Sequence, residues 1–236
     1  MLPGVAVAEV IAGERTERYA MKSAGLMTAI ALGLSVLVGC GQADGMPAIV
    51  ATVNGEDISR HDLNLRVDQE RQNYAEQGVD LDAEPELLTE VQSAVLEELI
   101  NETLLLGYAA DAGITASQED IDAQYEVLVE QVQGEERLEE LLEMQGLGRD
   151  ELMELIADEV VLRRLQDYER EVRGLVVTEA LLQEAYSRYL EIVPDMPPLD
   201  EVRPYLIDEL ERQQFRAVLP ELIVTLREGA DIEVYL

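Results

Sequence analysis

The sequence has 236 residues, of which 47% are hydrophobic, so it can bury the core of one large domain or two small ones. Only 4% of the residues are aromatic and Trp is absent, which leaves Leu, Val, Ile, Ala and Tyr to build that core. The 50 acidic and 17 basic residues give a net charge of −33, which repels polyanions and excludes nucleic acid as an expected partner.

The basic residues are unusual because Lys22 is the only lysine and all the others are Arg. Two interpretations stay open. One is a GC-rich genome, and the other is adaptation to high salt, in which a dense carboxylate surface stays hydrated and its self-repulsion is screened. Cys40 is the only cysteine, so no intramolecular disulfide can form.

Residues 21–39 are typical of a signal peptide, with Lys22 before an uncharged run that is too short and too rich in Gly to favour a membrane-spanning helix. The run ends in Leu37-Val38-Gly39-Cys40, which resembles the lipobox of bacterial lipoproteins. The resemblance implies a lipid on Cys40, cleavage before it and acylation of the new amino terminus. Several acyl chains would anchor the protein stably, and Gly41 after the cysteine favours the outer membrane over the inner one.

The flanking segments complete this leader. Residues 1–20 contain three Glu and two Arg and fit poorly as the start of a signal, so we expect translation to begin at Met21. Residues 40–47 are small and polar, and they predict a flexible tether between the lipid and a domain that spans residues 48–236.

The domain is expected to begin with a short strand over residues 48–53, followed by a tight turn at Asn54-Gly55. Ser59 then caps a helix, with Asp62 at the third position of a capping box. A stronger helix is predicted over 85–112. That helix is apolar around much of its circumference and should be central, and Gly113 is expected to end it.

Four further helices follow, each bounded by a capping residue, a glycine or a proline. Their predicted limits are Ser117 to Gly134, residues after Gly134 to Gly146, 149–172 before Gly174, and Thr178 to about Tyr189. A last helix is predicted over 200–228, with a kink or interruption at Pro220.

Residues 231–236 alternate as a strand does. A lone strand could not satisfy its backbone groups, so we expect it to pair with residues 48–53. The predicted fold class is therefore mostly α, a multi-helix domain closed by a small β pairing of its N- and C-terminal strands.

This order of elements resembles the chaperone core of the SurA family and the related PrsA foldases and EpsD-like lipoproteins. The segments that match are the opening strand and cap 51–59, the central helix 96–105, the turn and cap 113–121, the piece 177–179 with Tyr186, and the closing helix and strand 199–234. The resemblance implies a SurA-like helical chaperone domain over 48–236.

One departure bears on chemistry. Family members with isomerase activity insert a parvulin domain between the last two helices, whereas only a short Pro-rich link separates Tyr189 from Leu199 here. The parvulin signatures are not found, so we expect no catalytic residue and no prolyl isomerase activity, even though homologues have it.

Other chemistry lacks the residues that it needs. One His and one Cys cannot make a zinc site, and Lys22 cannot serve a Walker-type phosphate loop. We expect no metal and no cofactor. The carboxylates Glu97-Glu98 and Glu135-Glu136 with Glu139-Glu140 are interpreted as solvated helix faces, and His61 as a surface residue. The tyrosines expected in the core or lining a groove are Tyr125, Tyr168, Tyr186 and Tyr189.

The leading hypothesis is a membrane-anchored periplasmic holdase or assembly factor that binds unfolded or partly folded exported proteins. Two alternatives stay open: an accessory lipoprotein of an envelope export machine, and an inactive relative of the prolyl isomerases. The lipid on Cys40 would place the protein on the periplasmic side of the outer membrane. No client-binding residue is assigned from the sequence.

Overall fold

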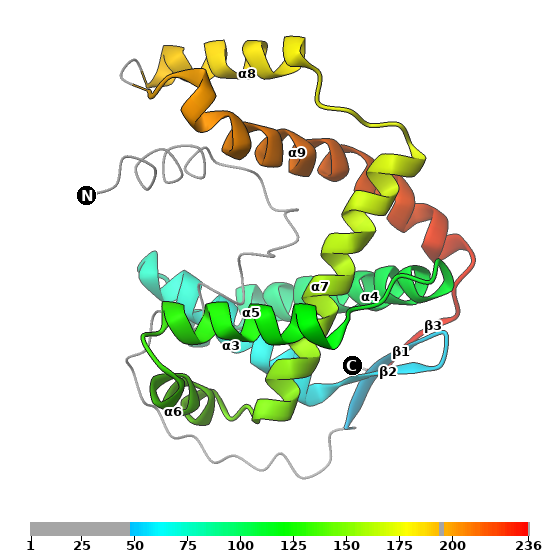
Figure 1. Cartoon of the computed structure of the whole chain (residues 1–236). Helices are drawn as coiled ribbons and strands as arrows, with labels where there is room; N and C mark the ends of the chain where they lie inside the picture. Colours follow the sequence, from blue (N-terminus) through cyan, green and yellow to red (C-terminus); the bar gives the residue numbers. More distant parts are fainter. Residues whose placement is uncertain (1–47, 194–195, 236) are drawn as a thin grey trace. The chain divides into compact units, whose positions relative to one another are not determined.

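The computed structural model describes residues 48–193 and 196–235, and these form seven α-helices, one short 3₁₀ helix and three strands (Figure 1). They group into two compact units, one made of 163–222 and the other of 48–162 together with 223–235. Helices α7 (Arg149–Val172) and α9 (Leu199–Glu228) each contribute to both units. Among the described residues, no helix combines the length and the apolar character needed to cross a bilayer.

The two ends of the described chain meet in a small antiparallel sheet with the strand order β2-β1-β3. Strand β1 (Ile49–Val53) pairs with β3 (Ile232–Val234), and Ala51 lies opposite Val234. The predicted pairing of the N- and C-terminal strands is therefore confirmed, and with it the mostly α fold class.

Strand β2 (Glu56–Ser59) was not predicted, because Glu and Asp at its start are poor strand formers. The turn before it decides its conformation. Asn54 and Gly55 both have positive φ, at 53° and 86°, which is the geometry of a two-residue hairpin turn. The turn directs residues 56–59 back along β1, and backbone pairing then outweighs their weak propensity.

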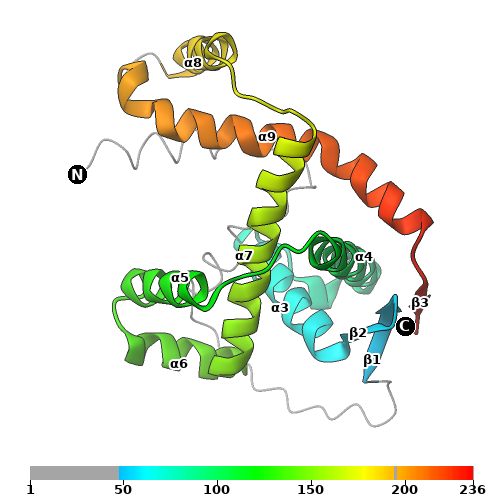
Figure 2. The same ribbon diagram turned by 45° about the vertical axis from the view of Figure 1, so that its right-hand side comes forward.

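Helices α3 (Arg60–Glu76) and α4 (Pro85–Asp111) pack beside this sheet, with the 3₁₀ helix Leu81–Ala83 between them in the chain (Figure 2). The predicted box at Ser59 is present: its Oγ accepts from the Asp62 N–H at 3.1 Å, and Asp62 accepts from the Ser59 N–H. As expected, α4 is central, and it buries Val91, Val95, Leu96, Leu99, Ile100, Leu104, Leu105 and Ala109.

A second core in the same unit is formed by α5 (Gln118–Gln131), α6 (Glu135–Gln145) and the first half of α7 (Figure 2). Ser117 caps α5 through a box with Asp120, as predicted. Gly146 ends α6 in the left-handed conformation with φ 70°. The residues that pack together here are Tyr125, Leu128, Leu138, Leu141, Leu142, Leu152, Ile156 and Val160.

The unit made of 163–222 has its own core between α8 (Glu179–Ile192) and the first half of α9. Thr178 caps α8 by accepting from the Leu181 N–H at 3.2 Å. Helix α9 is continuous through Pro220, so of the two predicted alternatives, a kink or an interruption, the interruption is wrong. Buried residues on both sides of the proline, Phe215, Leu219 and Leu222, hold the helix although Pro cannot donate a backbone hydrogen bond.

Candidate functional site

The residue expected to bear the lipid, Cys40, lies outside the described residues. The predicted signal peptide at 21–39 and the tether up to residue 47 also lie outside the described residues, as do residues 1–20, which precede the expected translation start at Met21. Lipidation of Cys40 therefore stays a prediction from the sequence.

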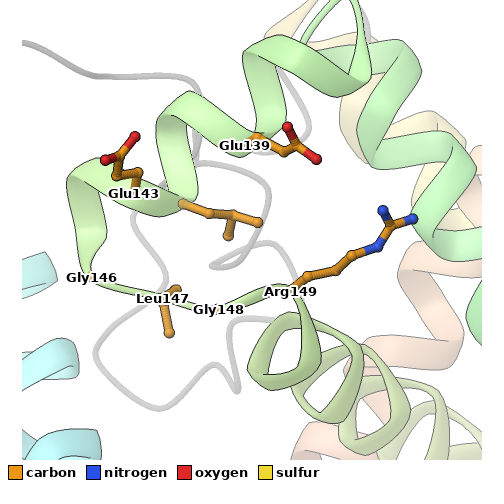
Figure 3. Close-up of a pocket in the computed structure, with 7 residues that line it drawn as sticks. Glu139, Glu143, Gly146, Leu147, Gly148 and Arg149 are labelled. Carbon is orange, nitrogen blue, oxygen red and sulfur yellow. The ribbon is translucent and has the colours of Figure 1, made fainter.

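An open pocket of about 390 Å³ lies on the described surface where α6 turns into α7. Figure 3 shows Glu139 and Glu143 on α6 along one side of the opening, and the chain from Gly146 to Arg149 along the other. Leu142 and Leu147 provide apolar surface between these two sides. The pocket thus combines an apolar floor with charged side chains at its edge.

Local hydrogen bonds fix the turn that forms this pocket. The Leu147 N–H donates to the Leu142 carbonyl at 3.0 Å, which is the bond expected after a left-handed glycine such as Gly146 at a helix C-terminus. One residue later, the Gly148 N–H donates to Glu151 Oε2 at 2.6 Å. Each side of the turn is therefore tied to a neighbouring helix end, and the pocket is already formed without a ligand.

The charges around the pocket are not equivalent. Arg149 Nη1 lies 2.9 Å from Glu135 Oε1, and its guanidinium carbon lies 4.7 Å from the centre of the Tyr125 ring. Its positive charge is thus engaged by an ion pair and a cation–π contact. Glu139 and Glu143 are exposed and form no ion pair within the described part of the chain. The net charge at the opening is therefore negative.

A second cluster of ionisable groups lies where α7 meets α3 and α4. Arg66 Nη2 donates to both carboxylate oxygens of Glu102, at 3.0 Å each. The pKa of Asp158 on α7 is raised to about 6, chiefly by burial and also by the negative charges of Glu102 and Glu154, while Arg66 opposes them. Three carboxyl groups with one guanidinium can retain a proton near neutral pH.

Other residues singled out from the sequence, His61 and the carboxylates of α4 and α6, lie on the surface. His61 Nε2 lies 3.8 Å from Glu151 Oε1, and both side chains are about half exposed. Glu97 pairs with Arg227, and Glu140 pairs with Arg137 at 2.8 Å, so these carboxylates lie on solvated helix faces as expected. In the described ranges, no group of His, Cys, Asp or Glu side chains is placed to hold a metal ion.

Three of the four tyrosines expected in the core or in a groove pack into apolar cores. Tyr125 is buried between α5, α6 and α7, and its hydroxyl donates to Glu135 at 3.2 Å. Tyr186 and Tyr189 pack between α8 and α9, and the Tyr186 hydroxyl donates to the Pro197 carbonyl at 2.9 Å. These three tyrosine side chains are therefore structural. The pocket and Asp158 were not predicted from the sequence.

The sequence signal for the pocket was the pair of glycines around Leu147, which marks a turn but not its concave side, and Glu139 was interpreted only as part of a solvated helix face. Asp158 had a weaker one, an acid between the apolar positions Ile156 and Val160 of a long helix. Neither signal reveals which side chains of α3, α4 or α6 face these residues, because that depends on how the helices pack.

Comparison with known proteins identifies the family to which this chain belongs. Residues 15–166 match the model of the SurA-like N-terminal domain, which is more than half of the chain. The chain belongs to this family. The match includes β1, β2 and helices α3 to α6 with most of α7, which are the elements that form the two cores of the unit containing the pocket.

Individual proteins that are similar to this chain agree with this assignment. The chain is 24% identical over 190 residues to the foldase protein PrsA of Clostridium botulinum strain Loch Maree, an alignment that covers 73% of this chain and 56% of that protein. It is 27% identical over 164 residues to PrsA of strain 657, with 61% and 49% covered. It is 34% identical over 139 residues to the chaperone SurA of Methylobacillus flagellatus, with 57% and 30% covered.

The chain thus spans about half the length of the PrsA proteins that it matches. Beyond the matched residues, 193–198 connect α8 directly to α9. A folded domain of about a hundred residues is therefore not inserted at this point, where the resemblance places the parvulin domain of the isomerases.

Proposed function

We propose that this chain is a holdase-type chaperone that binds unfolded or partly folded exported proteins and does not isomerise their prolines. Membership of the SurA-like N-terminal domain family is the observation on which this proposal depends. A lipid on Cys40 would hold the protein on the periplasmic side of the outer membrane. The mechanism is binding rather than catalysis, because apolar segments of a client are removed from water while they are held.

Exposed apolar side chains support such binding, and per residue they are denser in the shorter unit, 163–222. Among the described residues, nine large hydrophobic side chains are exposed, and four of them lie within 163–222. These four are Val172, Val176, Ile192 and Tyr205, with exposed fractions between 50% and 66%. Surfaces of this kind offer apolar contact to unfolded chains.

The distribution of charge also favours binding of clients to the 163–222 unit. Residues 163–222 contain 13 acidic and eight Arg side chains, a net charge of −5. Residues 48–162 with 223–235 contain 33 acidic side chains and six Arg, a net charge of −27. An apolar client segment that binds the 163–222 unit removes fewer charged groups from water, which costs less free energy. The more acidic unit keeps the loaded complex soluble.

The proposal is tested by diluting a urea-unfolded outer-membrane protein into buffer and following its aggregation by light scattering. A several-fold molar excess of this protein should delay aggregation. The double variant V176S/Y205S should delay it less, because two apolar contacts are lost from the 163–222 unit. V224S is the matched control, since Val224 is equally exposed, at 57%, but lies in the other unit.

Three results would contradict the proposal. The first is unchanged aggregation at a several-fold excess of the wild-type protein. The second is a proline-limited refolding reaction that this protein accelerates, which would indicate isomerase activity instead. The third is recovery from membranes with a single folded partner in fixed stoichiometry, which would favour an accessory lipoprotein of an export machine.

A further inference from the structure

The pocket between α6 and α7 offers apolar surface that α5, α6 and α7 leave open. Its floor contains Leu142, which belongs to the second core, and Leu147, which packs against that core and is only partly covered. A volume of about 390 Å³ lies at the lower end of the range of ligand pockets. It can take one or two side chains rather than a folded domain.

The charge at the edge of this pocket specifies the chemistry of its occupant. Glu139 and Glu143 are separated by one helical turn and have no cationic partner among the described residues, whereas Arg149 is already paired with Glu135. The surrounding segment, residues 118–145, contains ten acidic side chains and a single Arg. Anionic ligands such as phosphate groups are repelled by this field, and ammonium or guanidinium groups are attracted.

We propose that this pocket binds segments of unfolded polypeptide in which an apolar side chain is flanked by Lys or Arg. The inference rests on the proposed chaperone function and adds a charge preference to it. The apolar side chain would contact Leu142 and Leu147, and the neighbouring cationic groups would reach Glu139 and Glu143. Complementary charge then selects the segment, while apolar contact holds it.

The turn supports this role because it is fixed before any ligand arrives. The bonds from Leu147 to Leu142 and from Gly148 to Glu151 hold the chain on one side of the pocket, and α6 forms the other side. A site that is already ordered loses little conformational entropy on binding. A second contact site, distinct from the exposed apolar side chains of 163–222, would also allow one long client to bind at two points.

The test measures binding of short fluorescent peptides to the purified full-length protein by fluorescence anisotropy. The probe alternates Lys and Leu, one comparison peptide has Glu in place of each Lys, and another has Ser in place of each Leu. We expect the Lys–Leu peptide to bind more tightly than either comparison peptide. Its affinity should fall when NaCl is raised to about 1 M, because exposed charges are then screened.

Variants then locate the site. E139Q/E143Q should bind the Lys–Leu peptide roughly three- to tenfold more weakly, the effect expected for two exposed charge pairs. E86Q/E90Q is the matched control: Glu86 and Glu90 are also exposed and one turn apart, and they lie on α4 of the same unit. This control removes the same charge and should leave binding unchanged. A thermal melt of each variant confirms that it is folded.

Two outcomes would overturn the inference. If E86Q/E90Q weakens binding as much as E139Q/E143Q, the attraction comes from the net charge and not from the pocket. If the Lys–Ser peptide binds as tightly as the Lys–Leu peptide, the apolar floor plays no part.

The same experiment separates this inference from the proposed function. A protein that shows the expected peptide pattern but does not delay client aggregation has the site and is not a holdase. A protein that delays aggregation but binds all three peptides equally is a holdase without this charge preference.

Discussion

Asp158 shows how the surroundings of one residue determine its chemistry. It lies on α7 between two buried apolar residues and is itself only partly exposed. Burial and the nearby carboxylates raise its pKa from 3.8 to about 6, and Arg66 offsets only part of this because it is bonded to Glu102. Below pH 3.8 the group is neutral in the folded and unfolded states, and the stability that its neutral form provides is lost as the pH rises through about 6.

Asp158→Asn should therefore stabilise the protein at neutral pH. The amide resembles the protonated acid and removes a partly buried charge, so we expect a gain of about 1 to 2 kcal/mol at pH 7.5, discounted for partial exposure. Near pH 4.5 the gain should fall to about a third of that value, because Asp158 is then protonated in the fold but still mostly ionised in the unfolded chain. Urea denaturation at both pH values measures the difference.

Glu126→Gln is the control for this measurement, because Glu126 is exposed on α5 and its substitution should change stability little at either pH. A D158N variant that is less stable than the wild type at pH 7.5 would contradict the prediction. It would mean that attraction to Arg66 outweighs burial and repulsion.

At the level of elements, the junction between α4 and α5 is determined almost entirely by local sequence. Gly113 has φ 74°, and the Ile114 N–H donates to the Ala109 carbonyl at 2.8 Å, which closes the end of α4. Four residues later Ser117 caps α5. A side chain at position 113 would meet no atom within 4 Å, so the requirement for glycine is conformational rather than steric.

Gly113→Ala and Gly107→Ala should consequently change stability in opposite directions. Alanine at 113 must adopt a positive φ, and we expect a loss of about 1 kcal/mol. Gly107 lies inside α4 with ordinary helical backbone and open space around it, so alanine there should stabilise the helix by up to about 1 kcal/mol. Thermal unfolding of the two variants measures both effects. Destabilisation by both would show that the space at 107 is needed.

At the level of the whole molecule, the uneven charge bears on membrane attachment. The unit formed by 48–162 and 223–235 has a net charge of −27, and anionic headgroups repel it. In the described residues, no helix is suited to cross the bilayer. The lipid predicted on Cys40 would provide membrane attachment that does not depend on charge.

Replacing residues 1–40 by the signal peptide of a soluble periplasmic protein should therefore release this protein entirely into the soluble periplasmic fraction. The wild-type protein should stay with the membranes even after a wash at high salt, because insertion of acyl chains is not electrostatic. Fractionation followed by immunoblotting measures both. Release of the wild-type protein by salt alone would contradict lipid anchoring.

Most of the fold was determined by the sequence itself, because its signals are local. Capping residues such as Ser59, Ser117 and Thr178, and glycines such as Gly146, set helix limits within a few residues of themselves. Apolar periodicity identified α4 as central, and the pairing of β1 with β3 followed from the need of each strand for a partner. These inferences need only backbone preferences and a count of hydrogen-bonding groups.

Tertiary structure decided everything that depends on which faces meet. Strand β2 follows a local turn at Asn54-Gly55 but also needs pairing with β1 to offset the weak strand preferences of residues 56–59. Helix α9 continues through Pro220 with buried side chains on both sides of it. The raised pKa of Asp158 and the pocket between Glu139 and Arg149 arise from groups on different helices. Distances between such groups are set by packing, and no local pattern along a single chain encodes them.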